Sequence, residues 1–159
     1  MTKFNTNINE ERIVIYCDGG CRGNNKKENI GGYGSVLLYK QYKKEIYQGF
    51  KNTTNNRMEI RAVIESLKAL KKTHIPVEIR TDSAYVCNCL NQKWYLKWMN
   101  NGWLTSKGTT VENRDLWIEL VDQLGRFANI SFVKVKGHSD DEGNNLADYL
   151  ANKAMDSVK

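Results

Sequence analysis

Hydrophobic residues follow two different periods along the chain, and these periods predict its strands and helices. Arg12–Cys17 is an apolar, β-branched run, typical of a central strand that is buried on both faces. Tyr33–Tyr39 and Lys44–Phe50 predict two further strands, which form a hairpin turning around Gln41–Lys43. The segment from Gly19 to Gly34 is rich in glycine at its ends and predicts a loop.

Apolar residues at helical spacing begin after this hairpin. Residues 55–72 carry Ile60, Val63, Ile64, Leu67 and Leu70 on one side and charges on the other, which predicts an amphipathic helix. Pro76 restarts the chain before a short predicted strand at 77–81. The remaining pattern predicts helices at 84–90, 111–124 and 144–155, and a last strand at 130–135.

The order of these elements restricts the fold. Three successive strands can form an antiparallel meander, and two later strands reached through helices can join in parallel by right-handed crossovers. The sequence therefore predicts an α/β fold with a mixed five-stranded sheet flanked by helices. We expect one domain over residues 11–157, preceded by a disordered segment at residues 1–10.

Composition and charge narrow the class of protein. No apolar run reaches the roughly 18 residues that a membrane span needs, and the polar N-terminus does not resemble a secretory signal. A cytoplasmic protein is therefore expected. The 24 Lys and Arg exceed the 18 Asp and Glu, and this net charge of +6 favours a polyanionic partner, although it also suits mere solubility. The spacing of the four cysteines argues against a zinc site.

Four acidic residues fall where the predicted fold brings them together. Asp18 and Asp82 each follow a strand, and parallel strands place such residues at one edge of the sheet. Glu59 lies at the margin of its helix's apolar stripe, and Asp148 shares a helical face with Asn144. Each alone has an ordinary reading as a turn, cap or surface residue. Together they predict a site for Mg²⁺, which prefers oxygen ligands and activates water for phosphodiester hydrolysis when two ions are held side by side.

Five motifs carry a resemblance to a known family. They are YCDGGCRGN at 16–24, GGYG at 31–34, TTNNRMEI at 53–60, TDSAYV at 81–86 and VKGHSDDEGNNLAD at 135–148. With them the chain resembles bacterial-type ribonuclease H of type I, from about Arg12 to Met155. The resemblance implies hydrolysis of the RNA strand of RNA–DNA hybrids with Mg²⁺ or Mn²⁺, leaving a 5′-phosphate. It also implies a monomer without an obligate protein partner or membrane association.

The resemblance assigns roles to individual residues. Asp18, Glu59, Asp82 and Asp148 would be the catalytic metal ligands, and His138 would assist proton transfer or product release from its loop. Contacts with the hybrid would come from Asn24, Thr54, Asn55, Asn56 and Asn144, and from a basic, Trp-rich protrusion at residues 93–108 that contains Lys93, Trp94, Lys97, Trp98 and Trp103. The alternative for the tryptophans is packing of the protrusion against its own stem.

Two rival functions share these features. Integrases, transposases and junction resolvases use the same fold and acidic cluster, but the full set of motifs and the protrusion argue against them. A non-catalytic module that only binds hybrids is the rival from another class. The presence of all four carboxylates argues against it.

Overall fold

A computed structural model of the protein describes residues 11–23, 28–136 and 141–158. Its centre is a five-stranded sheet in the order β3-β2-β1-β4-β5, with the first three strands antiparallel and β4 and β5 parallel to β1. The predicted mixed sheet is confirmed. The strands are β1 (Ile13–Arg22), β2 (Ile30–Tyr39), β3 (Tyr42–Lys51), β4 (Val77–Thr81) and β5 (Ile130–Lys134). The helices are α1 (Asn55–Lys68), α2 (Ala84–Asn91), α3 (Trp94–Asn100), α4 (Arg114–Leu124) and α5 (Glu142–Asp156).

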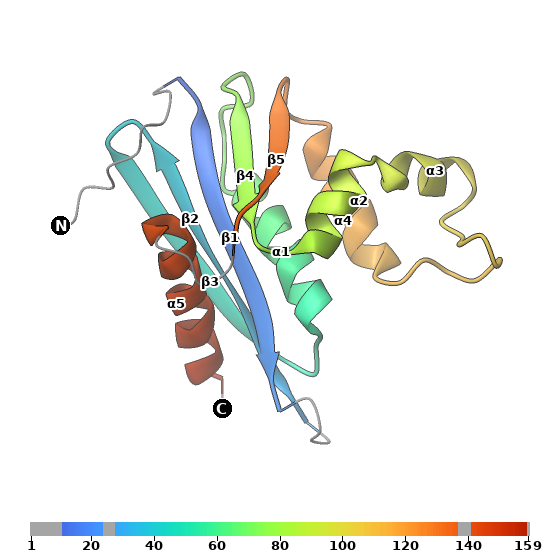
Figure 1. The fold of residues 1–159 in the computed structure, drawn as a ribbon, viewed down its shortest axis with the longest axis horizontal. Coiled ribbons are helices and arrows are strands. Elements are labelled where there is room, and N and C mark those ends of the chain that lie inside the picture. The colour runs from blue at the N-terminus through green and yellow to red at the C-terminus, as the bar shows by residue number, and fades with distance from the viewer. Residues whose placement is uncertain (1–10, 24–27, 137–140, 159) are drawn as a thin grey trace.

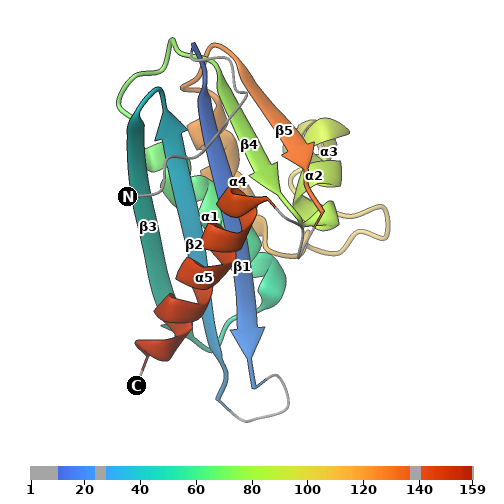
Figure 2. The same ribbon diagram turned by 60° about the vertical axis from the view of Figure 1, so that its left-hand side comes forward.

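Helices cover both faces of the sheet, but unequally. Helices α1, α2 and α4 contribute to the main core on one face, whereas α5 lies alone across β1, β2 and β3 on the other (Figures 1 and 2). Alternate residues of β1 serve the two sides: Ile15 points into the main core, and Val14 and Tyr16 into the smaller one. Burial on both faces explains why this stretch of sequence is apolar throughout.

A glycine on β2 allows α5 to lie directly on the sheet. A Cβ atom at Gly34 would lie 2.5 Å from the carbonyl oxygen of Ala147 and 2.6 Å from the backbone nitrogen of Ala151. Only a residue without a side chain permits this contact. Because α5 carries Asp148, the approach at Gly34 sets how close that carboxylate comes to the sheet.

Several predicted boundaries were wrong. The Gly-rich stretch from Gly19 to Gly34 is not a loop throughout, because β1 continues to Arg22 and pairs with β2 from Ile30 onward. The predicted helix at 55–72 ends at Lys68. The helix predicted at 111–124 begins at Arg114, because Asn113 before it is left-handed with φ of 62°. The expected disordered segment at residues 1–10 lies outside the described residues.

The predicted protrusion contains a helix that the sequence pattern did not indicate. Helix α3 and the chain that follows it extend away from the sheet (Figure 1). An isolated bridge between Leu104 and Thr110 closes this excursion before α4 begins. Within the described ranges, no helix is both long and apolar enough to cross a membrane.

Candidate active site

Two strands bring Asp18 and Asp82 to the same place. The parallel pairing of β1 with β4 ends at Cys17 opposite Thr81, and the next residue on each strand is one of the two aspartates. The prediction that both aspartates end their strands was half right. Strand β4 ends at Thr81, but β1 continues past Asp18 in its pairing with β2. Asp18 is therefore held by a paired strand, and only 8% of its surface is exposed.

Helix α1 brings Glu59 against these two aspartates. Thr54 begins the helix, since its side chain accepts a hydrogen bond from the Arg57 amide at 3.1 Å. A Cβ atom at Gly19 would lie 2.6 Å from the Glu59 nitrogen, so α1 touches the β1 backbone directly after Asp18. Glu59 is 9% exposed, and the Thr81 hydroxyl lies 3.5 Å from its carboxylate. The predicted position at the margin of the core is confirmed.

The fourth acid, Asp148, reaches the site from the opposite face of the sheet. It lies on the second turn of α5 and is exposed, yet its carboxyl group interacts with Asp18 through a hydrogen bond and through its charge. Asn144, one turn earlier, is only 4% exposed. The described structure thus brings together the four carboxylates that the sequence singled out.

Three of these acids form a compact group of oxygen ligands. Asp18, Glu59 and Asp82 each offer one carboxylate oxygen, and the three atoms lie within 4.8 Å of one another. Two carboxylates at 4.8 Å repel by about 3–4 kcal/mol at an effective dielectric constant near 20. Such a group needs a compensating positive charge, and carboxylate oxygens are the ligands that Mg²⁺ and Mn²⁺ prefer. The donor set therefore fits a divalent metal ion.

The same crowding shifts the protonation of the site. Burial raises the pKa of Asp18 to about 8, and the charge of Asp82 and the hydrogen bond and charge of Asp148 contribute further. Burial also raises the pKa of Glu59 well above its ordinary value, followed by the charges of Asp18 and Asp82. Hydrogen bonds from the Gly19 backbone act in the opposite direction on both acids. Strongly raised carboxyl pKa values in one cluster mark a functional site.

A network that the sequence did not predict joins the sheet to the start of α5. Arg80 donates to the Tyr16 hydroxyl at 2.6 Å and to Glu78 at 2.7 Å, and Arg12 donates to Glu78 at 2.8 Å. The Tyr16 hydroxyl also interacts with Asp141, the residue that caps α5. Tyr16 on β1 is paired with Arg80 on β4, and Arg12 directly precedes β1, so only the pairing of the strands reveals that these side chains meet.

The predicted substrate-binding residues fall into two groups. Thr54, Asn55 and Asn56 are exposed at the start of α1, close to Glu59 in sequence and in space. Lys93, Trp94 and Lys97 are exposed on or beside α3. Asn24, and His138, which was predicted to be catalytic, lie outside the described residues.

Two of the tryptophans pack within the stem of the protrusion. The ring of Trp98 lies 6.1 Å from Trp103 and 6.0 Å from the fully buried Trp117, measured between centroids. Both Trp98 and Trp103 are partly buried against the main core. Trp94 is more exposed, at 39%, and its indole donates to Gln92 at 2.9 Å. The packing alternative is thus realised for Trp98 and Trp103.

The cysteine beside Asp18 is a core residue. Cys17 is completely buried, and the Ser35 hydroxyl donates to its sulfur at 3.6 Å. Burial raises the pKa of the Cys17 thiol to about 12, so the reactive thiolate is suppressed. Cys17, Cys21, Cys87 and Cys89 are all free thiols.

Comparison with known proteins places the chain in one family. The family model for RNase H matches residues 10–156. The ribonuclease H of Clostridium botulinum is 49% identical over 92% of this chain and 97% of its own length. That of Caldanaerobacter subterraneus subsp. tengcongensis is 50% identical over 92% of this chain and 93% of its own.

Solved structures agree with this placement. The crystal structure of LC9-RNase H1, a type 1 RNase H with the type 2 active-site motif, superposes with a TM-score of 0.81 and 30% sequence identity, covering 97% of this chain and 76% of that one. RNase H1 from the archaeon Halobacterium salinarum gives a TM-score of 0.69 at 26% identity over 92% of this chain and 99% of that one. With the acidic cluster and the mixed sheet, these matches establish that the chain belongs to the ribonuclease H family of nucleases.

Proposed function

We propose that the protein hydrolyses the RNA strand of RNA–DNA hybrids, with two Mg²⁺ ions held by Asp18, Glu59, Asp82 and Asp148, and leaves a 5′-phosphate. Mn²⁺ would serve in place of Mg²⁺. The observation that carries the proposal is the group of three carboxylate oxygens within 4.8 Å in a chain of this family. When bound, such ions activate a water molecule and stabilise the leaving oxygen.

The protein's own residues position the reacting groups. Buried Asp18 and Glu59 cannot rotate freely, because the Gly19 backbone and the Thr81 hydroxyl hold their carboxylates. Asp148 on α5 closes the site from the other face of the sheet. His138, in the segment just before α5, is proposed to accept or deliver the proton as product leaves.

The substrate is proposed to lie across the start of α1. The first turn of a helix exposes unpaired amides and carries a partial positive charge, which favours a phosphate group. Thr54, Asn55 and Asn56 lie there and are exposed, and we propose that they, together with Asn24 and Asn144, contact the hybrid. A wide, shallow minor groove with 2′-hydroxyls is the surface that such polar side chains recognise.

The protrusion is proposed to follow the DNA strand. Lys93 and Lys97 are exposed and supply positive charge, and Trp94 offers an accessible ring. Trp98 and Trp103 would act there mainly by keeping α3 in place, because the Trp98 ring packs against both Trp117 and Trp103. We further propose a cytoplasmic monomer, and the four free thiols suit a reducing compartment.

A cleavage assay tests the proposal. Purified protein with Mg²⁺ should cut end-labelled RNA in an RNA–DNA hybrid and leave RNA–RNA and DNA–DNA duplexes intact. Asp18→Asn should abolish cutting while hybrid binding persists. Asp122→Asn makes the same chemical change at an exposed position of α4 and should cut normally. Ligation of the products to a 3′-hydroxyl acceptor reports the 5′-phosphate.

The outcomes separate the rival functions. Equal cutting of all three duplexes would point to a nuclease without hybrid specificity. Binding of the hybrid without cutting, at any Mg²⁺ or Mn²⁺ concentration, would leave the non-catalytic module as the better description. Full activity of Asp18→Asn would show that the acidic cluster is not the reaction centre.

A further inference from the structure

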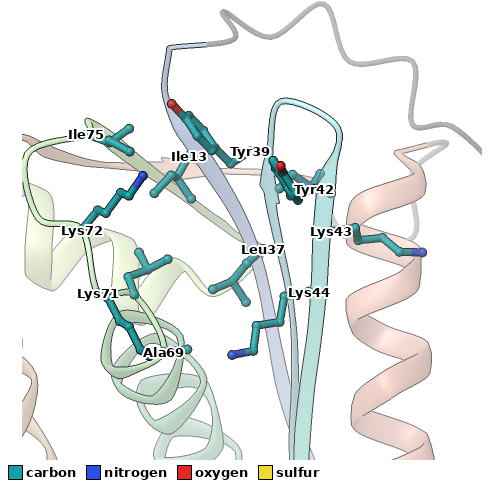
Figure 3. A pocket seen from close by; sticks show the side chains of 12 residues that line it. Ile13, Leu37, Tyr39, Tyr42, Lys43, Lys44, Ala69, Lys71, Lys72 and Ile75 are labelled. Carbon is teal, nitrogen blue, oxygen red and sulfur yellow. The ribbon is translucent and has the colours of Figure 1, made fainter.

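A cavity of about 610 Å³ opens at the end of β1 that lies away from the acidic site. Its walls come from the start of β1, the β2–β3 hairpin and the segment that follows α1 (Figure 3). Ile13 lines the cavity and Asp18 lies five residues further along β1. At about 3.3 Å per residue in a strand, the two positions are about 17 Å apart. The cavity is therefore separate from the acidic site.

The inner wall of the cavity is apolar. Ile13, Leu37 and Ile75 are 5%, 5% and 7% exposed and belong to the main core, and Ala69 and Leu70 pack against the same core. Cavities that hold small molecules usually measure about 300–1,000 Å³ and are lined mainly by hydrophobic and aromatic side chains. In size and lining, this cavity suits one small molecule with an apolar body.

The outer wall is positively charged. Lys44, Lys71 and Lys72 line it, and none of them forms an ion pair with a described residue, whereas nearby Lys68 is paired with Glu65 and Glu119. Among the described residues, no Asp or Glu lines the cavity. Figure 3 shows Lys44 extending from β3 toward α1, and Lys72 toward Ile13, while Lys43 points away toward α5. An anionic group at this wall would meet uncompensated positive charge.

The end of α1 would ordinarily repel an anion, but a cation binds two carbonyl groups there. The last turn of a helix carries a partial negative charge. The Arg126 guanidinium donates to the carbonyl oxygens of Leu67 and Leu70 at 3.0 and 2.7 Å. This cation offsets the helix end next to the cavity, so the positive charge of the lysines is not cancelled there.

The lining also excludes several classes of ligand. The polar side chains among its described lining residues are those of lysines and of two tyrosines, Tyr39 and Tyr42. A nucleobase or a sugar has several donors and acceptors, and burying them without partners is costly. Amide, carboxylate and aliphatic hydroxyl side chains, which would pair with such groups, are absent from the twelve residues that form the wall. The chemistry that remains is an alkyl chain joined to an anionic head.

We propose that this cavity binds a long-chain carboxylate, with its alkyl chain on the wall of Ile13, Leu37 and Leu70 and its carboxylate beside Lys44, Lys71 and Lys72. The apolar wall selects the chain and the lysines select the charge. This site is independent of the proposed hydrolysis of hybrids, since no lining residue belongs to the acidic site.

Titration calorimetry with dodecanoate, below its micelle concentration, tests the proposal. Decanoate should bind about fifteenfold more weakly, because each buried methylene contributes a factor of about four. The double variant Lys44→Gln/Lys72→Gln should bind dodecanoate at least about fivefold more weakly than the wild-type protein does. Both proteins should bind neutral dodecanol with the same affinity. Lys51→Gln, at the far end of the same strand, is the matched control and should bind dodecanoate normally.

Three results would overturn the proposal. One is no heat of binding with dodecanoate together with no amide shifts in β1 and β2 by nuclear magnetic resonance. Another is equal affinity of the wild-type protein for decanoate and dodecanoate, which would mean that the chain is not buried. The third is equal weakening in the Lys51 variant, which would mean a general charge effect. Unchanged cleavage of a short hybrid by the double variant would confirm that it is folded.

Discussion

Replacing Asp18 by asparagine should stabilise the metal-free protein at alkaline pH. In the folded state Asp18 is buried next to Asp82 and Asp148, and its pKa rises from 3.8 to about 8. In the unfolded chain its carboxyl group is solvated and ionises near pH 4. Between these values the unfolded chain releases its proton first, so the stability of the folded protein falls as the pH rises from about 4 to about 8.

The size of this effect follows from the same values. A pKa shift of one unit corresponds to about 1.4 kcal/mol. The pKa of Asp18 is raised by about four units, so its ionisation lowers the free energy of unfolding by up to about 5–6 kcal/mol at pH 8. Burial of the carboxylate is the largest contribution to this cost, and repulsion from Asp82 and Asp148 adds to it. Asparagine has nearly the same shape and carries no charge. We therefore expect Asp18→Asn to raise the free energy of unfolding by about 2–5 kcal/mol at pH 8 and to change it little near pH 4.

Urea unfolding at pH 4, 6 and 8 in the presence of a chelator measures this difference. Asp115→Asn is the matched control, because Arg57 lowers the pKa of Asp115 by hydrogen bonding and the sign is then reversed. That variant should be less stable than the wild-type protein at pH 8. Mg²⁺ should stabilise the wild-type protein by mass action and Asp18→Asn much less. Equal or lower stability of Asp18→Asn at pH 8 without metal would refute the electrostatic reasoning.

Three further substitutions test how the site is supported. Gly34→Ala should lower stability by about 1–3 kcal/mol and reduce cleavage, because the new Cβ would lie 2.5 Å from the Ala147 carbonyl oxygen on α5; Gly20→Ala, whose nearest neighbour is 3.8 Å away, should be mild in a thermal unfolding assay. Trp98→Ala should cost about 2 kcal/mol in urea unfolding through lost aromatic packing, and an unchanged midpoint would argue for a ring that only contacts substrate. Thr54→Ala should cost about 1 kcal/mol through loss of the α1 cap, which circular dichroism melting would detect, while Thr54→Ser should retain it.

The sequence predicted the elements of the fold better than their ends. The apolar run of β1 and the helical stripe of α1 are both clear patterns, and each element begins within one residue of its predicted start. The extension of β1 past Asp18 was missed, because glycines in a strand read as a loop unless the partner strand is known. Helix α3 was missed because its seven residues are too few for a helical period to stand out, and none of them is buried in the core.

The acidic site was predictable for a different reason. Asp18 and Asp82 each follow the last residue of the parallel pairing between β1 and β4, and this pairing brings the two positions together whatever the side chains elsewhere. The depth of Glu59 and the interaction of Asp148 with Asp18 depend on how α1 and α5 dock on the sheet. Contacts between Tyr16, Arg80 and Glu78 depend on strand register, which single-sequence patterns do not specify.

The position of α5 has a consequence for the protein during its synthesis. Every strand of the sheet and the other four helices precede this helix in the chain, yet it alone covers Val14 and Val36 and supplies Asp148. At about 5–20 residues per second, the stretch from the end of β5 to the end of α5 takes about one to four seconds to synthesise. During that interval the nascent protein combines an uncovered apolar face with an incomplete set of acids. The docking of α5 therefore both covers the apolar face, which would otherwise favour aggregation, and completes the set of acids that nuclease chemistry needs.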